Sequence, residues 1–474
     1  MGQESANGAH TVLASADPTG YASLRTTPTP REERYALGRA LRDEVPRKRL
    51  GDWNPPAGRP DPVTLVIEAH EGRQDRLIPL RVGRMVASPY AFLRGTAAIM
   101  AEDFSRVPST GITPVICGDA HLGNFGFYAS PERALVFDLN DFDEAHPGRW
   151  EWDLRRLTAS VHVAGRINGA SENDCAAAVV RCVAAYREQV WDLSGQPLLA
   201  RSFMTLDVDR LRETVSEESL RHDVERSANR ARKRTSDRAL PKLTALEGGR
   251  HRIVEDPPVI TRLTDSEYDE IAEALDVYLT TLPPHWRRLV AGYTLLDIAH
   301  KVVGVGSVGL RAYVALCEGS SPDDALFLQL KEARRSVVAR FVHGDSAWHQ
   351  HQGQRVVEYQ QALQTVSDPL LGWTSFGGRQ YYVRQFRDMK GAITVDDLGP
   401  QALADYAGVC GLLLAKGHSR TSGASMIAGY LGSSEKADQA FARFARRYAD
   451  QIERDHERLV AAVNRGLLPA EYGV

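Results

Sequence analysis

The stretch CGDAHLGNFG, residues 117–126, places Asp119, His121 and Asn124 on one short loop punctuated by glycines. A short apolar run, TPVICGDA, leads into this loop and predicts a strand. The following segment, NFGFYASPERALVFDLND, predicts a β-hairpin, because two apolar runs flank the turn-forming residues SPER. The hairpin brings the chain back to the loop with three further carboxylates, those of Asp138, Asp141 and Asp143.

Carboxylate and amide oxygens gathered on a loop and a hairpin suit phosphoryl transfer with magnesium. This reaction needs a carboxylate beside the acceptor hydroxyl, and an amide oxygen and a second carboxylate on the metal. Mg²⁺ prefers hard oxygen ligands of this kind. Taken by themselves, the same residues also fit a turn between strands, where Asp and Asn are common.

A second motif, GVGSVG at residues 304–309, has β-prone residues on both sides. It therefore predicts a hairpin turn, not the strand-to-helix turn of a dinucleotide-binding fold. The next apolar strand ends at Lys331, and a predicted helix, GQRVVEYQQAL, then carries Glu358. Glu358 is a candidate for an ion pair with Lys331, and Glu332, the next residue in the chain, is the alternative candidate. The alternative interpretation is an ordinary loop followed by a solvated strand end.

The segment GDAHLGN resembles the catalytic loop of the aminoglycoside phosphotransferase and choline kinase branch of the protein-kinase-like superfamily. The segment NDFDEAHPGRWEWDL resembles the metal-binding segment of that branch. The resemblance implies that Asp119 is the catalytic aspartate and that Asn124 is a magnesium ligand. Asp141 and Asp138 are both candidates for the metal-binding aspartate, and the sequence leaves the choice open.

Two other loop residues take their interpretation from the same resemblance. His121 is a candidate catalytic residue that would orient Asp119 or bind a phosphate. Cys117 is a departure, because the family often has histidine at this position. An ordinary loop histidine is the competing interpretation of His121.

The resemblance also gives roles to the second motif. The glycine-rich loop would cover the phosphates of ATP with its backbone amides, as in kinases. Its candidate residues are Gly304, Gly306, Ser307 and Gly309. Lys331 would neutralise the nucleotide phosphates, and Glu358 would pair with that lysine. ATP and Mg²⁺ are therefore the expected cofactors.

These two halves occur in the reverse of the usual kinase order, since the glycine loop follows the catalytic loop. A circular permutation accounts for this order, and permutation is tolerated where the joined ends lie close together at the surface. The predicted fold class is α+β, a two-lobed protein-kinase-like fold, circularly permuted, with a large helical lobe. In the alternative, residues 62–110 form a degenerate small lobe in which Arg81 or Arg84 replaces the lysine.

The predicted organisation has five parts. They are a disordered tail at 1–30, the catalytic-loop segment of the large lobe at 31–160, a helical insert or substrate region at 161–289, the nucleotide-binding small lobe at 290–395, and a helical part of the large lobe at 396–474. Within them we expect a strand pair in DPVTLVIEA and RLIPLRVGRM, and a helical region from Trp150 to about residue 227.

Composition excludes several classes of function. The 474 residues carry a formal net charge of −3, so no strong positive field attracts nucleic acid. No apolar run reaches the roughly 18 residues of a membrane span, and the first residues lack the pattern of a secretory signal. The five cysteines are scattered, which indicates a reduced, cytoplasmic protein without a disulfide framework or a zinc site.

As a whole, the chain is similar to a family of bacterial proteins catalogued as a domain of unknown function, from about residue 35 to the end. The segments RMVASPYAFLRG, CGDAHLGNFG, SPERALVFDLNDFDEAHPG and IAGYLG carry that similarity, which brings no activity with it.

The predicted function is an ATP- and Mg²⁺-dependent phosphotransferase acting on a hydroxyl of an unidentified small molecule or peptide. One alternative is a pseudokinase-like module that binds nucleotide or serves as a scaffold. A further alternative is a metal-dependent phosphohydrolase that uses Asp119, His121, Asp138 and Asp141.

Overall fold

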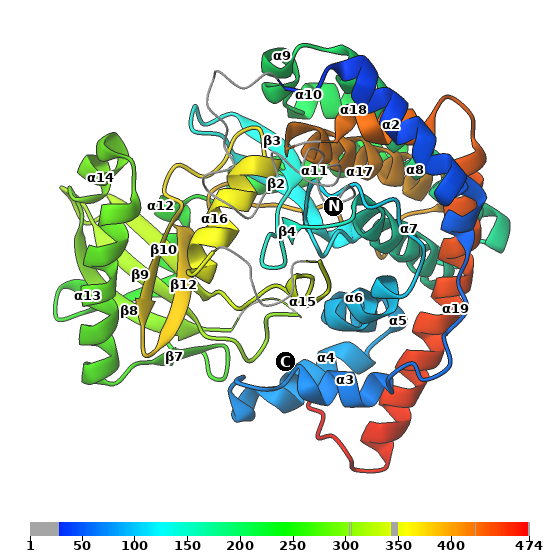
Figure 1. The fold of residues 1–474 in the computed structure, drawn as a ribbon. Helices are drawn as coiled ribbons and strands as arrows, with labels where there is room; N and C mark the ends of the chain where they lie inside the picture. Colours follow the sequence, from blue (N-terminus) through cyan, green and yellow to red (C-terminus); the bar gives the residue numbers. More distant parts are fainter. Residues whose placement is uncertain (1–27, 303, 305, 343–348, 422, 473–474) are drawn as a thin grey trace, which may run out of the picture.

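The computed structural model describes residues 28–302, 304, 306–342, 349–421 and 423–472. Over these residues the chain is a mixed α+β fold in which helices predominate and the sheets are antiparallel (Figure 1). Residues 1–27 of the predicted disordered tail lie outside the described residues. Among the described helices, none combines the length and the apolar character needed to cross a membrane.

The largest sheet has six strands in the order β11-β12-β10-β9-β8-β7. Its strands are β7 (Ile260–Arg262), β8 (Thr294–Lys301), β9 (Ala312–Glu318), β10 (Ala325–Glu332), β11 (Gly372–Phe376) and β12 (Arg379–Gln385). The strands predicted on both sides of the glycine loop and before Lys331 are confirmed as β8, β9 and β10. The sheet also takes β7 from the segment that the sequence assigned to a helical insert.

Both faces of this sheet pack against helices. Alternate residues of β10 point to opposite sides, and each set packs in a different apolar cluster. Leu328 and Leu330 pack in one apolar cluster with residues of α13 (Asp265–Thr281) and α14 (Pro284–Val290). Phe327 points to the other side and packs with Ala239 and Leu240 of α12 (Ser236–Leu243). Lys331 lies on the same face as Phe327, so its side chain points away from α13 and α14.

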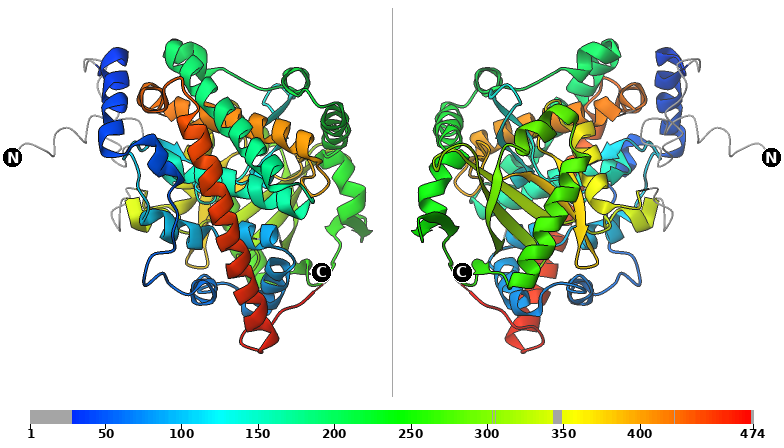
Figure 2. Two further views of the ribbon diagram at one scale, coloured as in Figure 1. Left: turned by 90° about the vertical axis from the view of Figure 1, so that its right-hand side faces the viewer. Right: turned by 90° about the vertical axis from the view of Figure 1, so that its left-hand side faces the viewer.

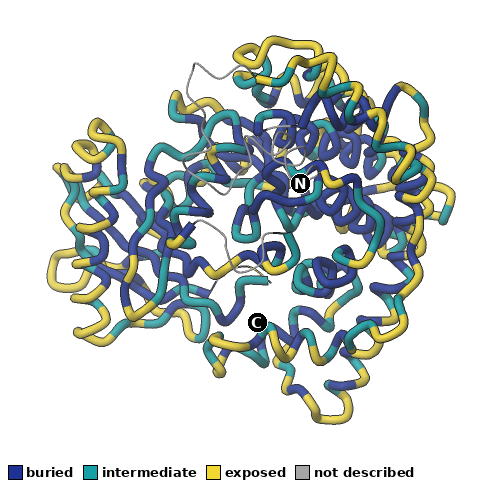
Figure 3. The backbone as a smooth tube through the Cα atoms, viewed as in Figure 1, coloured by how far each residue is buried: buried dark blue, intermediate teal, exposed yellow. Residues whose placement is uncertain are grey.

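The helical part of the molecule holds the largest apolar core, shown as the dark interior in Figure 3. Its main helices are α7 (Trp150–Ile167), α8 (Glu172–Gly195), α17 (Pro400–Thr421), α18 (Ala424–Leu431) and α19 (Lys436–Asn464). Helix α19 runs along the outside of this part, as Figure 2 shows in red. The core positions α7 and α17 beneath the loop at 117–126.

Short strands and helices complete the fold, and of these β5 and β6 pack against the six-stranded sheet. The strands are β1 (Val115–Ile116), β2 (Phe125–Ala129), β3 (Leu135–Leu139), β4 (His146–Pro147), β5 (Thr244–Glu247) and β6 (Arg250–Ile253). The helices are α2 (Arg31–Glu44), α5 (Pro89–Gly95), α6 (Ala97–Ser105), α9 (Leu198–Ser202), α10 (Val208–Thr214), α11 (Glu218–Arg232), α15 (Ala339–Val342) and α16 (Gln352–Leu363). Within the described residues, the short 3-10 helices are η2 (Arg47–Gly51), η3 (Asp75–Leu77) and η4 (Leu122–Asn124). The predicted hairpin at 124–141 is confirmed as β2 and β3.

The predicted strand pair before residue 86 is wrong, because both segments are helices: α3 (Pro62–Glu68) and α4 (Ile78–Val86). The side chain of Asp61 accepts the Thr64 N–H at 3.1 Å and caps α3, while Pro62 occupies its first turn. Helix α4 is buried on more than one side: Val82 and Met85 pack in the largest apolar core, and Leu80 packs with Val302 and Val308. No strand lies between residues 62 and 110, all of which are described, so this region is not a degenerate strand-rich lobe.

The predicted helical region from Trp150 onward is divided into several helices. Gly169, with φ +78°, ends the turn after α7, and Ser171 begins α8 with a capping box. Pro197 follows the end of α8. All five cysteines are buried as free thiols.

Candidate functional site

Helix α7 holds the loop at 117–124 in place through hydrogen bonds to its backbone. The carboxylate of Asp153, on α7, accepts the backbone N–H groups of Cys117 at 2.7 Å and Gly118 at 2.8 Å. Gly118 has φ +77°, and a Cβ there would lie 2.2 Å from the carbonyl oxygen of Glu144. Glycine is therefore required at this position, where the loop meets the segment that follows β3.

Asp119 lies at the centre of the loop with its side chain partly exposed. Its carboxylate forms an ion pair with the buried guanidinium of Arg156, which comes from α7. Burial raises the pKa of Asp119 to about 7, although Arg156 opposes that change. Asn124 donates through Nδ2 to the backbone carbonyl of Asp119 at 2.6 Å. Since this bond uses an amide donor, the Asn124 Oδ1 atom is left as an acceptor.

His121 caps the short helix η4 with its ring. Its Nδ1 accepts the backbone N–H of Gly123 at 3.0 Å, and burial holds the pKa of the ring well below its usual value. The ring is therefore neutral at physiological pH, and it lines the pocket beside Asp119.

The segment after β3 supplies an acidic cluster, which we define as Asp141, Asp143 and Glu144. Lys331 Nζ lies 2.8 Å from a carboxylate oxygen of Asp143 and 4.0 Å from one of Asp141. The hydroxyl of Tyr382 donates to the other oxygen of Asp143 at 2.7 Å. Burial alone would raise the pKa of Asp143, but the Lys331 ammonium outweighs it and holds that pKa below its usual range.

Lys331 reaches this cluster because of the register of the sheet. It pairs with Tyr382 across β10 and β12, and Gln329 pairs with Arg384 two residues earlier. Directly opposed residues of an antiparallel pair share a face, so all four side chains point away from α13. Two sequence segments separated by 188 residues are thereby joined through one ion pair.

The two candidate metal aspartates have different surroundings. Asp141 has a side chain that is 43% exposed and lines the pocket. Asp138, inside β3, is buried and forms an ion pair with Lys416 of α17. Of the two, the structure brings only Asp141 to the pocket.

Glu358 does not contact Lys331, which corrects the expected pairing. Its carboxylate accepts from His349 Nε2 at 2.7 Å and from Gln354 Nε2 at 2.8 Å. The alternative, Glu332, pairs with Arg311 and Arg379 instead.

Helix α16 presents Arg355 to the acidic segment, one turn before Glu358. The Arg355 guanidinium is buried and donates to the backbone carbonyls of Ala145, Asp143 (2.8 Å) and Arg334 (2.8 Å). The sequence did not identify this residue, because the phase of the helix against the sheet decides which side chain points inward.

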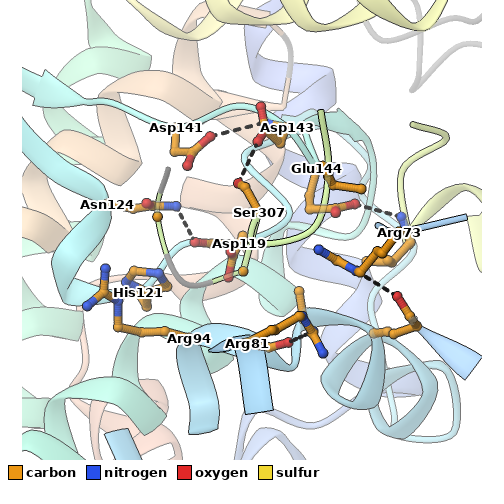
Figure 4. Close-up of a pocket in the computed structure, with 18 residues that line it drawn as sticks. Arg73, Arg81, Arg94, Asp119, His121, Asn124, Asp141, Asp143, Glu144 and Ser307 are labelled. Atoms are coloured by element: carbon orange, nitrogen blue, oxygen red, sulfur yellow. Dashed lines mark hydrogen bonds between the residues drawn. The ribbon is translucent and has the colours of Figure 1, made fainter. Parts of the chain in front are cut away.

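The described glycine-loop residues lie over the acidic cluster. Gly304, Gly306 and Ser307 line the pocket, and Ser307 Oγ lies 3.4 Å from Asp143 Oδ2 (Figure 4). Gly309 has φ +89° at the end of the turn. Arg73 donates to the carbonyl of Val308, which ties the loop to the helical part of the molecule.

Two adjoining pockets make up the site, and Asp141, Gly304 and Ser307 line both. The first, of about 150 Å³, contains Asp119, His121, Asn124, the acidic cluster, Arg73, Arg81 and Arg94. The second, of about 470 Å³, contains Lys331, Arg234 from the basic run at 221–234, and further basic residues that the sequence did not single out: Lys301, Arg384, Arg387 and Lys390. The run RQYYVRQFRDMK was the available signal for the last three.

The donor set fits a magnesium ion that is shared with substrate phosphates. Among the described residues, no group of three or more His, Cys, Asp or Glu side chains could enclose a metal ion. Asn124 and Asp141 offer one amide and one carboxylate oxygen in the same pocket. Mg²⁺ usually takes one or two protein oxygens and completes its shell with water and phosphate, so two ligands suffice.

Comparison with known proteins gives a family and no activity. A family model described as "Uncharacterized protein conserved in bacteria (DUF2252)" matches residues 73–462. No curated protein and no solved structure matches the chain.

Proposed function

The chain belongs to that DUF2252 family of bacterial proteins, and we propose that it is an ATP- and Mg²⁺-dependent phosphotransferase acting on a hydroxyl group. The observation that carries the proposal is the ion pair between Lys331 and Asp143, at 2.8 Å. It brings the lysine that follows the glycine loop to the aspartates that follow the catalytic loop. Phosphoryl transfer needs these parts around one nucleotide.

The order of elements supports a permuted kinase-like arrangement. From β8 the chain runs through the glycine loop, β9, β10 with its lysine, the short helix α15, helix α16, β11 and β12, and then α17. Near the end of α17, the Thr421 hydroxyl accepts the backbone N–H of Val115 at 3.1 Å. The helix therefore ends where the strand before the catalytic loop begins, although 306 residues separate the two in sequence. Read across this contact, the elements follow the order that the kinase resemblance implies.

The position of Cys117 also supports the alignment with Asp141. The thiol donates to the backbone carbonyl of Asp141 at 3.2 Å, and burial raises the pKa of Cys117 well above its usual value. The side chain is therefore a neutral donor. It ties the catalytic loop to the metal-binding segment from the position where the resembling family often has histidine.

The proposed reaction transfers the terminal phosphoryl group of ATP to an acceptor oxygen. The acceptor O–P bond forms, the bond to the bridging oxygen of ADP breaks, and the acceptor proton passes to the carboxylate of Asp119. Arg156 holds that carboxylate in place, and Lys331 neutralises charge on the nucleotide phosphates. Asn124 and Asp141 would hold Mg²⁺, which when bound supplies further charge neutralisation on the phosphates.

Thermal stabilisation and ATP consumption test this proposal together. We expect ATP to raise the melting temperature only with Mg²⁺, and ADP to form when pooled metabolites are added. Asp119→Asn should keep the stabilisation and lose the turnover. Stabilisation without any transfer would favour a pseudokinase-like binding module. Release of phosphate from simple esters without ATP would favour a phosphohydrolase.

A further inference from the structure

The first pocket has two ends of opposite charge, with Asp119 between them (Figure 4). The acidic cluster lies at one end. Two arginines, Arg81 and Arg94, lie at the other end, while Arg73 lies beside Glu144. Lys331 does not line this pocket but the adjoining one. The arginines therefore form a second cationic group, separate from the one proposed to hold the nucleotide.

Arg81, on α4, is a buried cation with unused donors. Its side chain is 2% exposed, and only Nη2 has a partner, the carbonyl oxygen of Gly95 at 2.8 Å. The Nε and Nη1 atoms are buried without a hydrogen-bond partner among the described residues. Burial and the neighbouring Arg73 and Arg334 lower its pKa, and no acidic side chain offsets that change. A buried guanidinium in this state is costly unless an anion meets it.

Arg94, at the end of α5, faces the same space from the side of His121. Figure 4 shows its side chain beside that ring, and its charge contributes to the low pKa of His121. The buried Nε atom of Arg94 has no hydrogen-bond partner among the described residues. Its guanidinium also makes no ion pair within the described part of the chain.

Arg73 differs from the other two arginines because its donors are in use. Its Nε donates to the carbonyl of Ala69 at 2.8 Å, and its Nη1 donates to that of Val308. Arg73 therefore holds the glycine loop in place. Arg81 and Arg94 are the two arginines at this end whose donors remain for a ligand.

From these contacts we propose that Arg81 and Arg94 bind an anionic group of the phosphoryl acceptor. This inference rests on the proposed function, and it narrows the substrate to a small hydroxylated molecule that carries a phosphate or a carboxylate. Guanidinium groups suit both anions, because charge-assisted hydrogen bonds to planar or tetrahedral oxygens are strong. With the anion held by the arginines, the acceptor hydroxyl would face Asp119.

Matched acceptors test the proposal. Glycerol 3-phosphate and glycerate share a glycerol-like skeleton with glycerol but carry a phosphate or a carboxylate. With Mg²⁺ and ATP we expect ADP formation with an anionic member at a kcat/KM at least about tenfold above that for glycerol. Glucose 6-phosphate and gluconate, compared with glucose, extend the panel to larger acceptors.

Variants locate the effect at the arginines. Arg94→Gln should raise the KM for the anionic acceptor at least about tenfold while the KM for ATP stays within about twofold. The matched control is Arg106→Gln, which removes an arginine that pairs with Glu102 and does not line the pocket. It should behave as the wild type in both constants.

Binding without ATP separates this inference from the proposed function. Calorimetry with glycerol 3-phosphate or glycerate should show binding that Arg94→Gln weakens and Arg106→Gln does not. If that holds and no ADP forms with any acceptor, the anion site stands and the phosphotransferase proposal fails. Equal turnover of neutral and anionic acceptors, an unchanged KM in Arg94→Gln, or no binding at millimolar concentration would overturn the anion site.

Discussion

Two lysine–aspartate pairs lie at either end of the same short stretch, and their surroundings are opposite. Asp138 pairs with Lys416 inside the helical core, where the two side chains are 5% and 0% exposed. Asp143 pairs with Lys331 at the edge of a pocket, with 24% and 6% exposure. The first pair is closed to solvent, and the second borders the two pockets of the site.

The two pairs differ in whether an uncompensated charge remains beside them. Lys416 and Asp138 neutralise each other and lie outside both pockets of the site. Around Lys331, the carboxylate of Asp141 remains 43% exposed after the ion pair with Asp143 has formed. The Asp141 carboxylate and the Asn124 amide oxygen can together bind a divalent cation from solution, whereas the buried, neutralised pair cannot. We infer that the reaction takes place at the pocket beside Lys331 and Asp141. The buried pair of Asp138 and Lys416 stabilises the fold.

The largest expected effect on turnover comes from Asp119, which lines the same pocket as Asp143. Asp119→Asn should lower kcat by about 10²–10⁴-fold, because the acceptor proton loses its base. Nucleotide affinity should stay within about twofold, since the amide keeps the shape of the side chain. Steady-state kinetics and calorimetry with Mg²⁺ and ATP measure both. Wild-type turnover in this variant would remove Asp119 from the mechanism.

Lys331→Met breaks the pair with Asp143 directly and should lower kcat/KM for ATP by about 10²–10³-fold, the size of effect that loss of one oxyanion-hole donor has in other active sites. The methionine keeps the length of the side chain, so the six-stranded sheet should remain folded by circular dichroism. An unchanged kcat/KM would show that nucleotide phosphates do not approach this lysine.

Cys117→Ala should have a small effect. It removes a weak S–H···O bond between the loop and Asp141, worth about 0.5–1 kcal/mol, so turnover should fall by only a few-fold. Cys182→Ala is the control, because this thiol is equally buried but lies on α8 away from both pockets. A loss as large as that of Asp119→Asn would assign the thiol a direct role in the reaction.

The closed pair should affect stability without affecting turnover. Asp138→Asn leaves the Lys416 ammonium buried without its counter-ion, and we expect the free energy of unfolding to fall by about 3–5 kcal/mol. Activity per folded molecule should match the wild type. Chemical denaturation and active-site-normalised kinetics measure the two quantities.

The double variant Asp138→Leu, Lys416→Met sharpens the contrast, because apolar replacement of both partners often restores stability. It should be more stable than Asp138→Asn alone. A loss of turnover per folded molecule in either variant would place Asp138 in the catalytic machinery.

The sequence predicts the parts of the site that depend on local pattern. The loop at 117–126, its following hairpin and the strand carrying Lys331 are each read from a short run of residues. Turn chemistry and strand periodicity act over such distances. These features place each side chain on its own element, which is why so much of the pocket lining could be named.

The sequence failed to predict features that depend on contacts between residues far apart in the chain. The choice between Asp138 and Asp141 depends on Lys416, which lies 278 residues from Asp138. Glu358 was assigned to Lys331 and Arg355 was not identified, because a single sequence does not show which face of α16 packs against the sheet. The segment RLIPLRVGRM fits a short strand as well as an amphipathic helix, and its burial as α4 settles the matter.

A crystal structure with Mg²⁺ and a non-hydrolysable ATP analogue tests the central claim most directly. We predict phosphates between Lys331 and the loop at 304–309, with the metal on Asn124 and Asp141 and the terminal phosphate facing Asp119. Nucleotide bound away from Lys331, or no binding at millimolar concentration, would contradict the claim that these two distant segments form one phosphotransfer site.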